Sequence, residues 1–150
     1  MRLEVTRRAE LAVLAVSALA DSAQADMARA DPAVTEGHRR LKAAELADTL
    51  GTTSGFVAQV VAPLVKAGWV RSVPGPTGGY TLAAAAAELS VLDIIEAVDG
   101  PTATGDCVVE DRPCRPDDGC PLHEAWSASR AVLLSTLGAT SALAWREGSR

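Results

Sequence analysis

Aromatic residues are scarce in this chain of 150 residues, which holds three Trp, one Tyr and one Phe. Alanine and valine supply much of the 48% hydrophobic content instead, which favours helices in close contact. The length suffices for one domain with a real core, or for a small domain plus an appendage.

Long hydrophobic runs are also missing. The run LAVLAVSALA has about ten residues, whereas a membrane-spanning helix needs about 20. Arg7 and Arg8 before this run give the outline of a secretory signal, but Glu4 and Glu10 place acid where such a signal needs positive charge. Three cysteines cannot all pair within one chain, which disfavours an oxidising compartment. We therefore expect a cytoplasmic protein with a buried first helix, and export is the alternative.

Catalytic motifs are absent as well. The sequence contains no glycine loop that would cradle a phosphate, no nucleophile elbow and no constellation of paired carboxylates. It therefore predicts a protein that is not an enzyme.

Charge is unevenly distributed. The net charge of −5 argues against a protein that coats nucleic acid indiscriminately. Residues 1–82 hold nine Lys/Arg and eight Asp/Glu, whereas residues 83–150 hold five and eleven. The first part could lie on a phosphate backbone, and the second would be repelled by one. This pattern fits an N-terminal binding module followed by an acidic module that senses or oligomerises.

The first half of the chain predicts a helix-turn-helix. We expect helices over 7–21 and 40–50, with a loop or frayed helix end over 22–37 between them. Gly51 ends the second helix, and Thr52, Thr53 and Ser54 are N-cap candidates for a third. Pro63 lies inside this third helix and should kink or shorten it.

A β-hairpin follows, with strands at 69–73 and 80–83 around the turn PGPTGG. This order is typical of a winged helix-turn-helix, whose third helix enters the major groove of DNA while the hairpin reaches the backbone or minor groove. A plain hairpin that closes a small helical core is the alternative. The predicted contacts to base edges or phosphates are Gln59 and Ser54, those to phosphates are Arg39, Arg40, Lys42 and Arg71, and those at the hairpin tip are Thr77, Gly78 and Gly79, whose two glycines should supply unusual dihedral angles.

The second half predicts two more helices. Ser90 should cap a helix that ends at Gly100, with Asp93 as the capping acid. A long helix beginning at Pro121 carries an apolar stripe that favours dimerisation over packing on its own domain. The predicted fold is mainly α with a small β-hairpin wing. Its parts are the winged helix-turn-helix domain (1–83), a connecting helix (84–100), a cysteine-rich cluster-binding loop (101–120), and a dimerisation helix with a C-terminal tail (121–150).

All three cysteines lie in one loop, with the spacing C-x6-C-x5-C-x2-H formed by Cys107, Cys114, Cys120 and His123. Three thiolates and an imidazole are four ligands for one metal centre. Zinc is a competitor, but zinc sites usually show paired C-x2-C turns, and wide spacing suits a larger cluster. A disulfide with one free cysteine would leave the histidine unexplained, and three unrelated surface cysteines would be liable to oxidation.

These motifs together resemble the IscR/NsrR family of winged-helix regulators over nearly the whole chain. The matching stretches are MRL, RRAELAV, LVKAGWVRSVPGPTGGYTLA, VLDIIEAVDG and the three spaced cysteines. The resemblance implies a homodimeric regulator of promoter DNA, here expected to be a repressor, that responds to redox state, nitric oxide or cluster supply. It implies an iron–sulfur cluster, [2Fe-2S] favoured and [4Fe-4S] the alternative, held by Cys107, Cys114 and Cys120. His123, or Glu10 from the partner subunit, would be the fourth ligand. A zinc-bound or thiol-based regulator of the same fold is the alternative.

Overall fold

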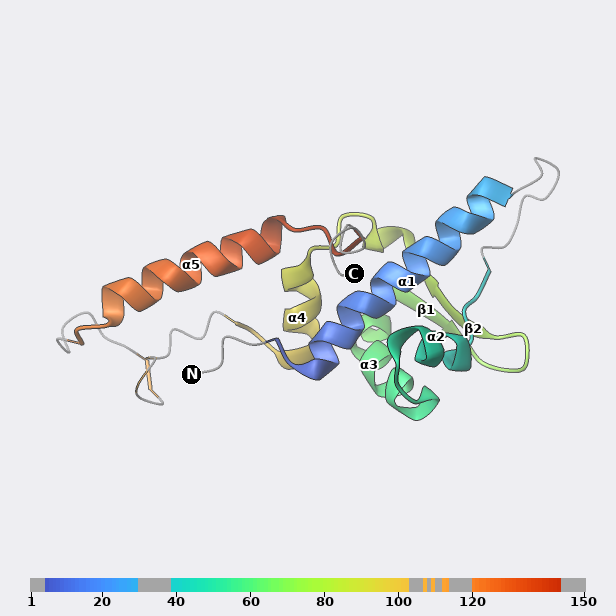
Figure 1. The fold of residues 1–150 in the computed structure, drawn as a ribbon, viewed down its shortest axis with the longest axis horizontal. Helices are drawn as coiled ribbons and strands as arrows, with labels where there is room; N and C mark the ends of the chain where they lie inside the picture. Colours follow the sequence, from blue (N-terminus) through green and yellow to red (C-terminus); the bar gives the residue numbers. More distant parts are fainter. Residues whose placement is uncertain are drawn as a thin grey trace.

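A computed structural model describes residues 5–29, 39–102, 107, 109, 112–113 and 120–143. Within them the chain forms mainly helices and one antiparallel pair of strands (Figure 1). The elements are α1 (Arg7–Arg29), α2 (Ala43–Leu50), α3 (Ser54–Lys66), β1 (Val70–Val73), β2 (Gly79–Leu82), the 3₁₀ turn η1 (Ala84–Ala86), α4 (Val91–Asp99) and α5 (His123–Ala139). The predicted mainly helical fold with a hairpin is confirmed.

Helix α1 crosses the molecule and supplies one wall of the core. It contacts α2, α3, α4 and β2, and it buries one face from Ala9 to Ala20. By length and composition Arg7–Ala28 could cross a membrane, but 44% of the apolar window is buried here, as expected of a core helix. The prediction that the helix ends at residue 21 is wrong. It continues to Arg29, because Ala, Gln and Met favour helix and no Pro or Gly occurs before Pro32.

Helices α2 and α3 pack together as the predicted helix-turn-helix. Gly51 between them has φ of 62° and ends α2, and the Thr53 side chain caps α3 by accepting from the Phe56 N–H at 3.3 Å. Helix α2 begins at Ala43 rather than residue 40. Pro63 does not shorten α3, which continues for three more residues to Lys66. The lost ladder bond lies in the last part of the helix, where most of α3 is already formed.

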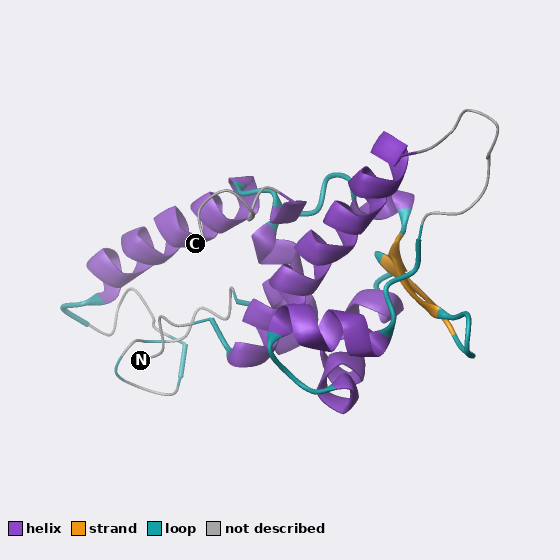
Figure 2. Cartoon of the chain, turned by 45° about the vertical axis from the view of Figure 1, so that its right-hand side comes forward, coloured by secondary structure: helices purple, strands orange, loops and turns teal. Residues whose placement is uncertain are grey.

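The hairpin projects from the helical body (Figure 2). Strands β1 and β2 pair antiparallel, with Arg71 opposite Thr81 and Val73 opposite Gly79. Leu41 adds a short third segment on the other side of β2, where its N–H donates to the Tyr80 carbonyl at 3.0 Å and its carbonyl accepts from the Tyr80 N–H at 2.8 Å. The chain that enters α2 is thereby attached to β2 of the hairpin, near the turn.

Helix α4 lies at the centre of the molecule and contacts α1, α3 and α5. Ser90 caps it as predicted: its Oγ accepts from the Asp93 N–H at 3.1 Å, and the Asp93 carboxylate accepts from the Ser90 N–H at 2.9 Å. Gly100 ends it with φ of 92°. The largest fully buried side chains of the core come from α1, α2, α3, β1 and α4: Leu11, Val16, Leu46, Val57, Val60, Val61, Leu64, Val70 and Ile94.

Helix α5 leaves the body and packs against it through α4 (Figure 1). It begins at His123, two residues after the predicted start at Pro121. None of its residues is buried in the single chain, and Val132 and Leu133 are 67% and 42% exposed. A 17-residue helix with so little covered surface lacks the packing that normally stabilises helices in water.

Candidate functional site

The outer face of α3 is exposed and made mostly of small side chains. Ser54, Ala58, Gln59 and Ala62 all lie on it. Gln59 is the long polar side chain of this face, and its amide can both donate to and accept from a base edge. The structure thus leaves both predicted base-contact residues of α3 open to a ligand.

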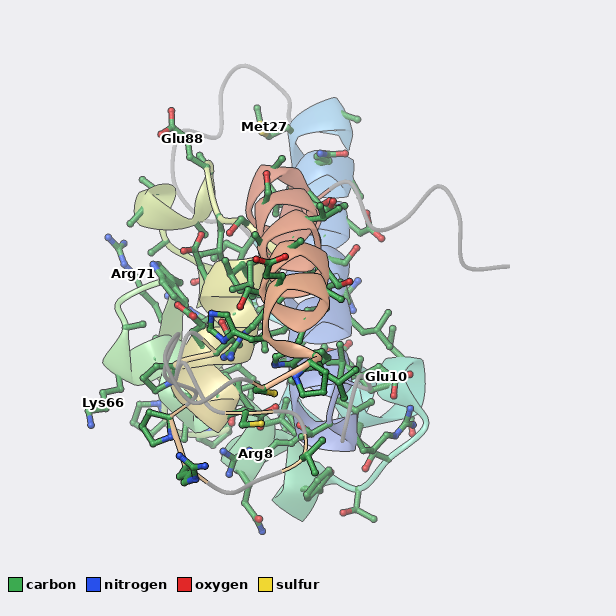
Figure 3. The ribbon with its side chains drawn as sticks, turned by 90° about the vertical axis from the view of Figure 1, so that its left-hand side faces the viewer. Arg8, Glu10, Met27, Lys66, Arg71 and Glu88 are labelled. Atoms are coloured by element: carbon green, nitrogen blue, oxygen red, sulfur yellow. The ribbon has the colours of Figure 1, made fainter. Side chains whose placement is uncertain are left out.

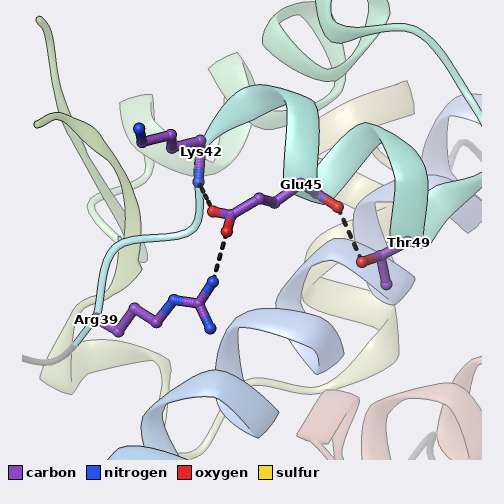
Figure 4. Close-up of polar contacts among 4 residues, drawn as sticks. All are labelled: Arg39, Lys42, Glu45 and Thr49. Atoms are coloured by element: carbon purple, nitrogen blue, oxygen red, sulfur yellow. Dashed lines mark hydrogen bonds and ion pairs between the residues drawn. The ribbon is translucent and has the colours of Figure 1, made fainter. Parts of the chain in front are cut away.

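Arg39, Lys42 and Glu45 meet at the start of α2 (Figure 4). One Glu45 carboxylate oxygen accepts from the Lys42 backbone N–H at 2.8 Å, and the other pairs with the Arg39 guanidinium at 2.5 Å. The Lys42 hydrogen bond and then the Arg39 hydrogen bond lower the pKa of the Glu45 carboxyl. Arg39 is therefore partly neutralised, whereas the Lys42 ammonium points away from this carboxylate (Figure 4).

Three further cations are exposed near the hairpin and α3. Arg40 precedes the Leu41 segment, and its Cβ lies 3.1 Å from where a Cβ on Gly79 would be. Arg71 lies on β1, opposite Thr81. Figure 3 shows Arg71 and Lys66, the last residue of α3, along one edge of the molecule. These side chains could follow a phosphate backbone beside the exposed face of α3.

The hairpin tip differs from the prediction at Gly78. Thr77 is exposed, and Gly79 has the expected positive φ, at 144°. Gly78 is buried and has no positive φ, and its N–H donates to the Gly75 carbonyl at 3.0 Å. A Cβ there would collide with the Val73 carbonyl oxygen, so Gly78 is required by steric crowding rather than by its dihedral angle.

Cys107 and Cys120 lie side by side, thirteen residues apart in sequence. Their Sγ atoms are 4.0 Å apart, and both side chains are half-buried. This distance far exceeds a disulfide bond of about 2.05 Å. Two thiolates on one tetrahedral metal, with metal–sulfur bonds of about 2.3 Å, would lie about 3.8 Å apart. The pair therefore has a spacing that suits two ligands of one metal centre. The Val109 N–H also donates to the Cys107 Sγ at 3.5 Å.

The start of α5 brings two nitrogen atoms close to this pair in sequence. The His123 backbone N–H donates to the Cys120 carbonyl at 3.2 Å, so His123 follows Cys120 by one turn of the backbone. The His123 Nδ1 and the Trp126 Nε1 are buried, and neither has a hydrogen-bond partner among the described residues. Buried polar atoms are normally paired. Both atoms therefore lack the partner that burial normally requires, three and six residues after Cys120.

The other two predicted ligands are placed differently. Cys114 lies outside the described residues. Glu10, on the first turn of α1, is exposed and forms an ion pair with Arg7 at 2.8 Å. In Figure 3 Glu10 lies across the molecule from Arg71 and Lys66. Within the described ranges no three Cys, His, Asp or Glu side chains gather as a metal site.

The segment that leads to Cys107 is fastened where it leaves α4. The Glu96 carboxylate accepts from the Thr102 N–H at 3.0 Å and from its hydroxyl at 2.5 Å, and these bonds lower the pKa of Glu96. The Arg8 guanidinium donates to the Val98 carbonyl in the last turn of α4. The end of α4 is thereby tied both to α1 and to the cysteine segment.

Sequence reasoning misses three of these features. Sequence reasoning assigns Trp126 only to the apolar stripe of the last helix. Its spacing of three residues from His123, which places both on one helix face, is the signal that could have drawn attention to it. The sequence does not indicate that Lys66 lies along the same edge of the molecule as Arg71. The pairing of Leu41 with Tyr80 joins residues far apart in sequence, and no local pattern indicates it.

Comparison with known proteins identifies the relatives of the chain. Residues 5–142 match the family model described as "Rrf2: Iron-dependent Transcriptional regulator". The HTH-type transcriptional regulator IscR of Xenorhabdus nematophila is 32% identical over 98 residues, which cover 65% of this chain and 59% of that protein. The HTH-type transcriptional regulator CymR of Bacillus subtilis is 28% identical over 106 residues, 71% of this chain and 70% of that protein.

Solved structures show the same fold. CymR, the global cysteine regulator of B. subtilis, matches with a TM-score of 0.69 at 21% identity over 94% of both chains. The IscR of T. potens matches with a TM-score of 0.63 at 22% identity, over 93% of this chain and 83% of that one. In the first curated relatives the match spans only about half of their length, from 45% to 59%. The family model nevertheless covers most of the chain, which therefore belongs to the Rrf2 family of transcriptional regulators.

Proposed function

We propose that this protein is a cytoplasmic, homodimeric repressor that binds promoter DNA and senses redox state or nitric oxide through an iron–sulfur cluster. The observation that carries the proposal is that the same chain contains an exposed helix-turn-helix and two cysteines whose Sγ atoms lie 4.0 Å from each other. The Rrf2 membership supports the regulatory role.

The DNA-binding part of the proposal rests on α3 and the hairpin. Helix α3 enters the major groove, where Gln59 and Ser54 face base edges. Arg40, Lys42 and Arg71 contact phosphates, which fix the position of α3 without reading sequence. Arg39 contributes less to this contact, because Glu45 already holds its guanidinium.

The dimer rests on the uncovered surface of α5. Because Val132 and Leu133 are exposed on a helix that the body leaves almost bare, a second α5 would cover them at little cost. Two joined subunits would then place two α3 helices on a two-fold site. Val132→Asp should give a monomer in sedimentation velocity, and a dimer that persists in this variant would contradict the role of α5.

The cluster part rests on the spacing of the two sulfurs and on the His123 Nδ1, which has no hydrogen-bond partner in the described part of the chain. Cys107, Cys120 and His123 would hold an iron–sulfur cluster together with Cys114, and an imidazole ligand favours the [2Fe-2S] type. Glu10 of the partner subunit is the alternative to His123, but in this structure its carboxylate is paired with Arg7. When bound, the cluster supplies a one-electron redox centre that nitric oxide or oxidants can damage.

Helix α4 couples the two parts. It contacts α3 on one side and α5 on the other, and Glu96 holds the segment leading to Cys107. A change in the cysteine segment can alter DNA affinity only if the two states place α3 differently, because a ligand shifts an equilibrium by its difference in affinity for the two states.

Purification without oxygen tests the proposal. The wild type should be coloured and contain iron and acid-labile sulfide, and native mass spectrometry should show the cluster mass on a dimer. Cys114→Ala should lose that mass. DNA binding in anisotropy should weaken steeply with salt and differ between cluster-bound and cluster-free protein. A colourless protein without iron or sulfide, even after reconstitution, would exclude the cluster.

A thiol-based or zinc-bound regulator is the second candidate, and the likeness to CymR of Bacillus subtilis favours its thiol-based form. Two sulfurs at 4.0 Å could hold zinc or could close to a disulfide after a small movement. Stoichiometric zinc in a colourless protein would support the first form. Loss of two titratable thiols on mild oxidation, with altered DNA affinity, would support the second.

A further inference from the structure

Among the described residues, the indole N–H of Trp126 is a buried donor without an acceptor. Indole nitrogen only donates, and buried indole groups usually find a partner. Among the described residues none accepts from the Trp126 Nε1. Its own backbone N–H donates to the Leu122 carbonyl at 2.9 Å, so the helix is regular at this point.

His123 lies three residues earlier, and so both side chains lie on the same face of the first turns of α5. Its Nδ1 is buried and partnerless too, within the part of the chain that the structure describes. An imidazole nitrogen without a proton offers a lone pair, whereas an indole N–H offers a proton. One bound group satisfies both atoms if it presents an electron-pair acceptor next to a hydrogen-bond acceptor. Iron bound to sulfide has these two properties side by side.

Cys120 connects His123 to the cysteine pair, because its carbonyl accepts from the His123 N–H at 3.2 Å and its sulfur lies 4.0 Å from that of Cys107. The Val109 N–H already donates to the Cys107 sulfur, so the pair receives one backbone donor from the cysteine segment. The Trp126 indole N–H, on α5, is a donor that no described residue uses.

We propose that Trp126 donates its indole N–H to a sulfur atom of the iron–sulfur centre and thereby sets its reduction potential. This inference rests on the proposed function. Donors to sulfur withdraw negative charge and favour the reduced cluster, which carries one electron more. Trp126 is then an outer donor and not a ligand, so its removal should change the potential of the cluster and leave the metal content intact.

Trp126→Phe tests this, since phenylalanine keeps an aromatic ring and removes the N–H. The variant should hold the same iron and acid-labile sulfide per chain as the wild type. Its midpoint potential, measured by anaerobic titration of the visible spectrum, should fall by about 59 mV, which is tenfold in the equilibrium constant of one-electron reduction. Trp69→Phe makes the same exchange just before β1 and should leave the potential unchanged.

The outcomes separate the two proposals. An unchanged potential in Trp126→Phe with full metal content overturns the role of Trp126 and leaves the proposed function standing. A wild type without iron and sulfide overturns the proposed function itself. If Trp126→Phe does not retain the cluster, ¹⁵N-indole spectra of the wild type decide. Cluster binding should broaden or shift the Trp126 indole signal, assigned in cluster-free protein, and an unaffected signal overturns the inference.

Discussion

Arg40 offers the sharpest test of the DNA-binding surface. It is exposed and precedes the residue that pairs with the hairpin, so its backbone position is fixed beside Gly79. Arg40→Ala should remove one phosphate contact per subunit, hence two per dimer. Each phosphate contact contributes about 0.9 to the slope of log affinity against log salt concentration, so the slope should become shallower by about 1.8.

The same slope gives the loss of affinity. If the two proteins bind equally at 1 M salt, where ionic contacts contribute little, a slope difference of about 1.8 predicts a loss of about 60-fold at 0.1 M. Fluorescence anisotropy with a promoter fragment at several KCl concentrations measures both quantities. Arg130→Gln, on α5, removes a positive charge far from the hairpin (Figure 1) and should leave the slope unchanged.

A slope for Arg40→Ala equal to that of the wild type would refute the placement of this residue on the phosphate backbone. An equal decrease in Arg130→Gln would show that net charge, rather than the position of Arg40, controls the slope. In either case the assignment of Arg40 to the phosphate backbone would have to be abandoned.

Three further predictions concern stability and the hairpin. Ser90→Ala removes the cap of α4 and should lower the free energy of unfolding in urea by about 1 kcal/mol, with the same exchange at Ser129, exposed on α5, as control. Gly79→Ala would place a Cβ 2.5 Å from the Leu41 carbonyl oxygen and should weaken DNA binding through the hairpin; wild-type affinity would contradict this. Hydrogen bonds from Thr102 lower the folded-state pKa of Glu96 below its ordinary value of 4.5, so their stabilisation is present above that pH and is lost as pH falls through the lowered pKa. Glu96→Gln should therefore flatten the pH dependence of unfolding below pH 4.5.

Local signals in the sequence suffice to predict several elements. Gly51, Thr53 and Ser90 mark helix ends through their own backbone and side-chain chemistry, and the structure places each where that chemistry requires. The hairpin follows in the same way, from two short apolar strands around a turn rich in Pro and Gly.

Errors arise where distant residues or weak signals decide. The end of α1 is misplaced because a polar composition resembles a loop, although Asp26 accepts a hydrogen bond from the Arg39 N–H and ties the far end of the helix to the chain entering α2. Pro63 disturbs α3 less than expected, because its position near the helix end matters more than its presence. The partial neutralisation of Arg39 by Glu45 depends on tertiary geometry at the start of α2.

The central place of α4 has a consequence for how this architecture can be reused. Ser90 and Asp93 cap its first turn, and Arg8 donates a hydrogen bond to its last turn. Both ends of α4 are thereby held, and the helix connects α3 to the chain that follows Gly100. If α4 transmits movement as proposed, any module that shifts this helix, with or without cysteine, would act on the same DNA-binding helix α3. Grafting a light- or drug-responsive module after Thr102 is thus a rational route to a synthetic gene switch.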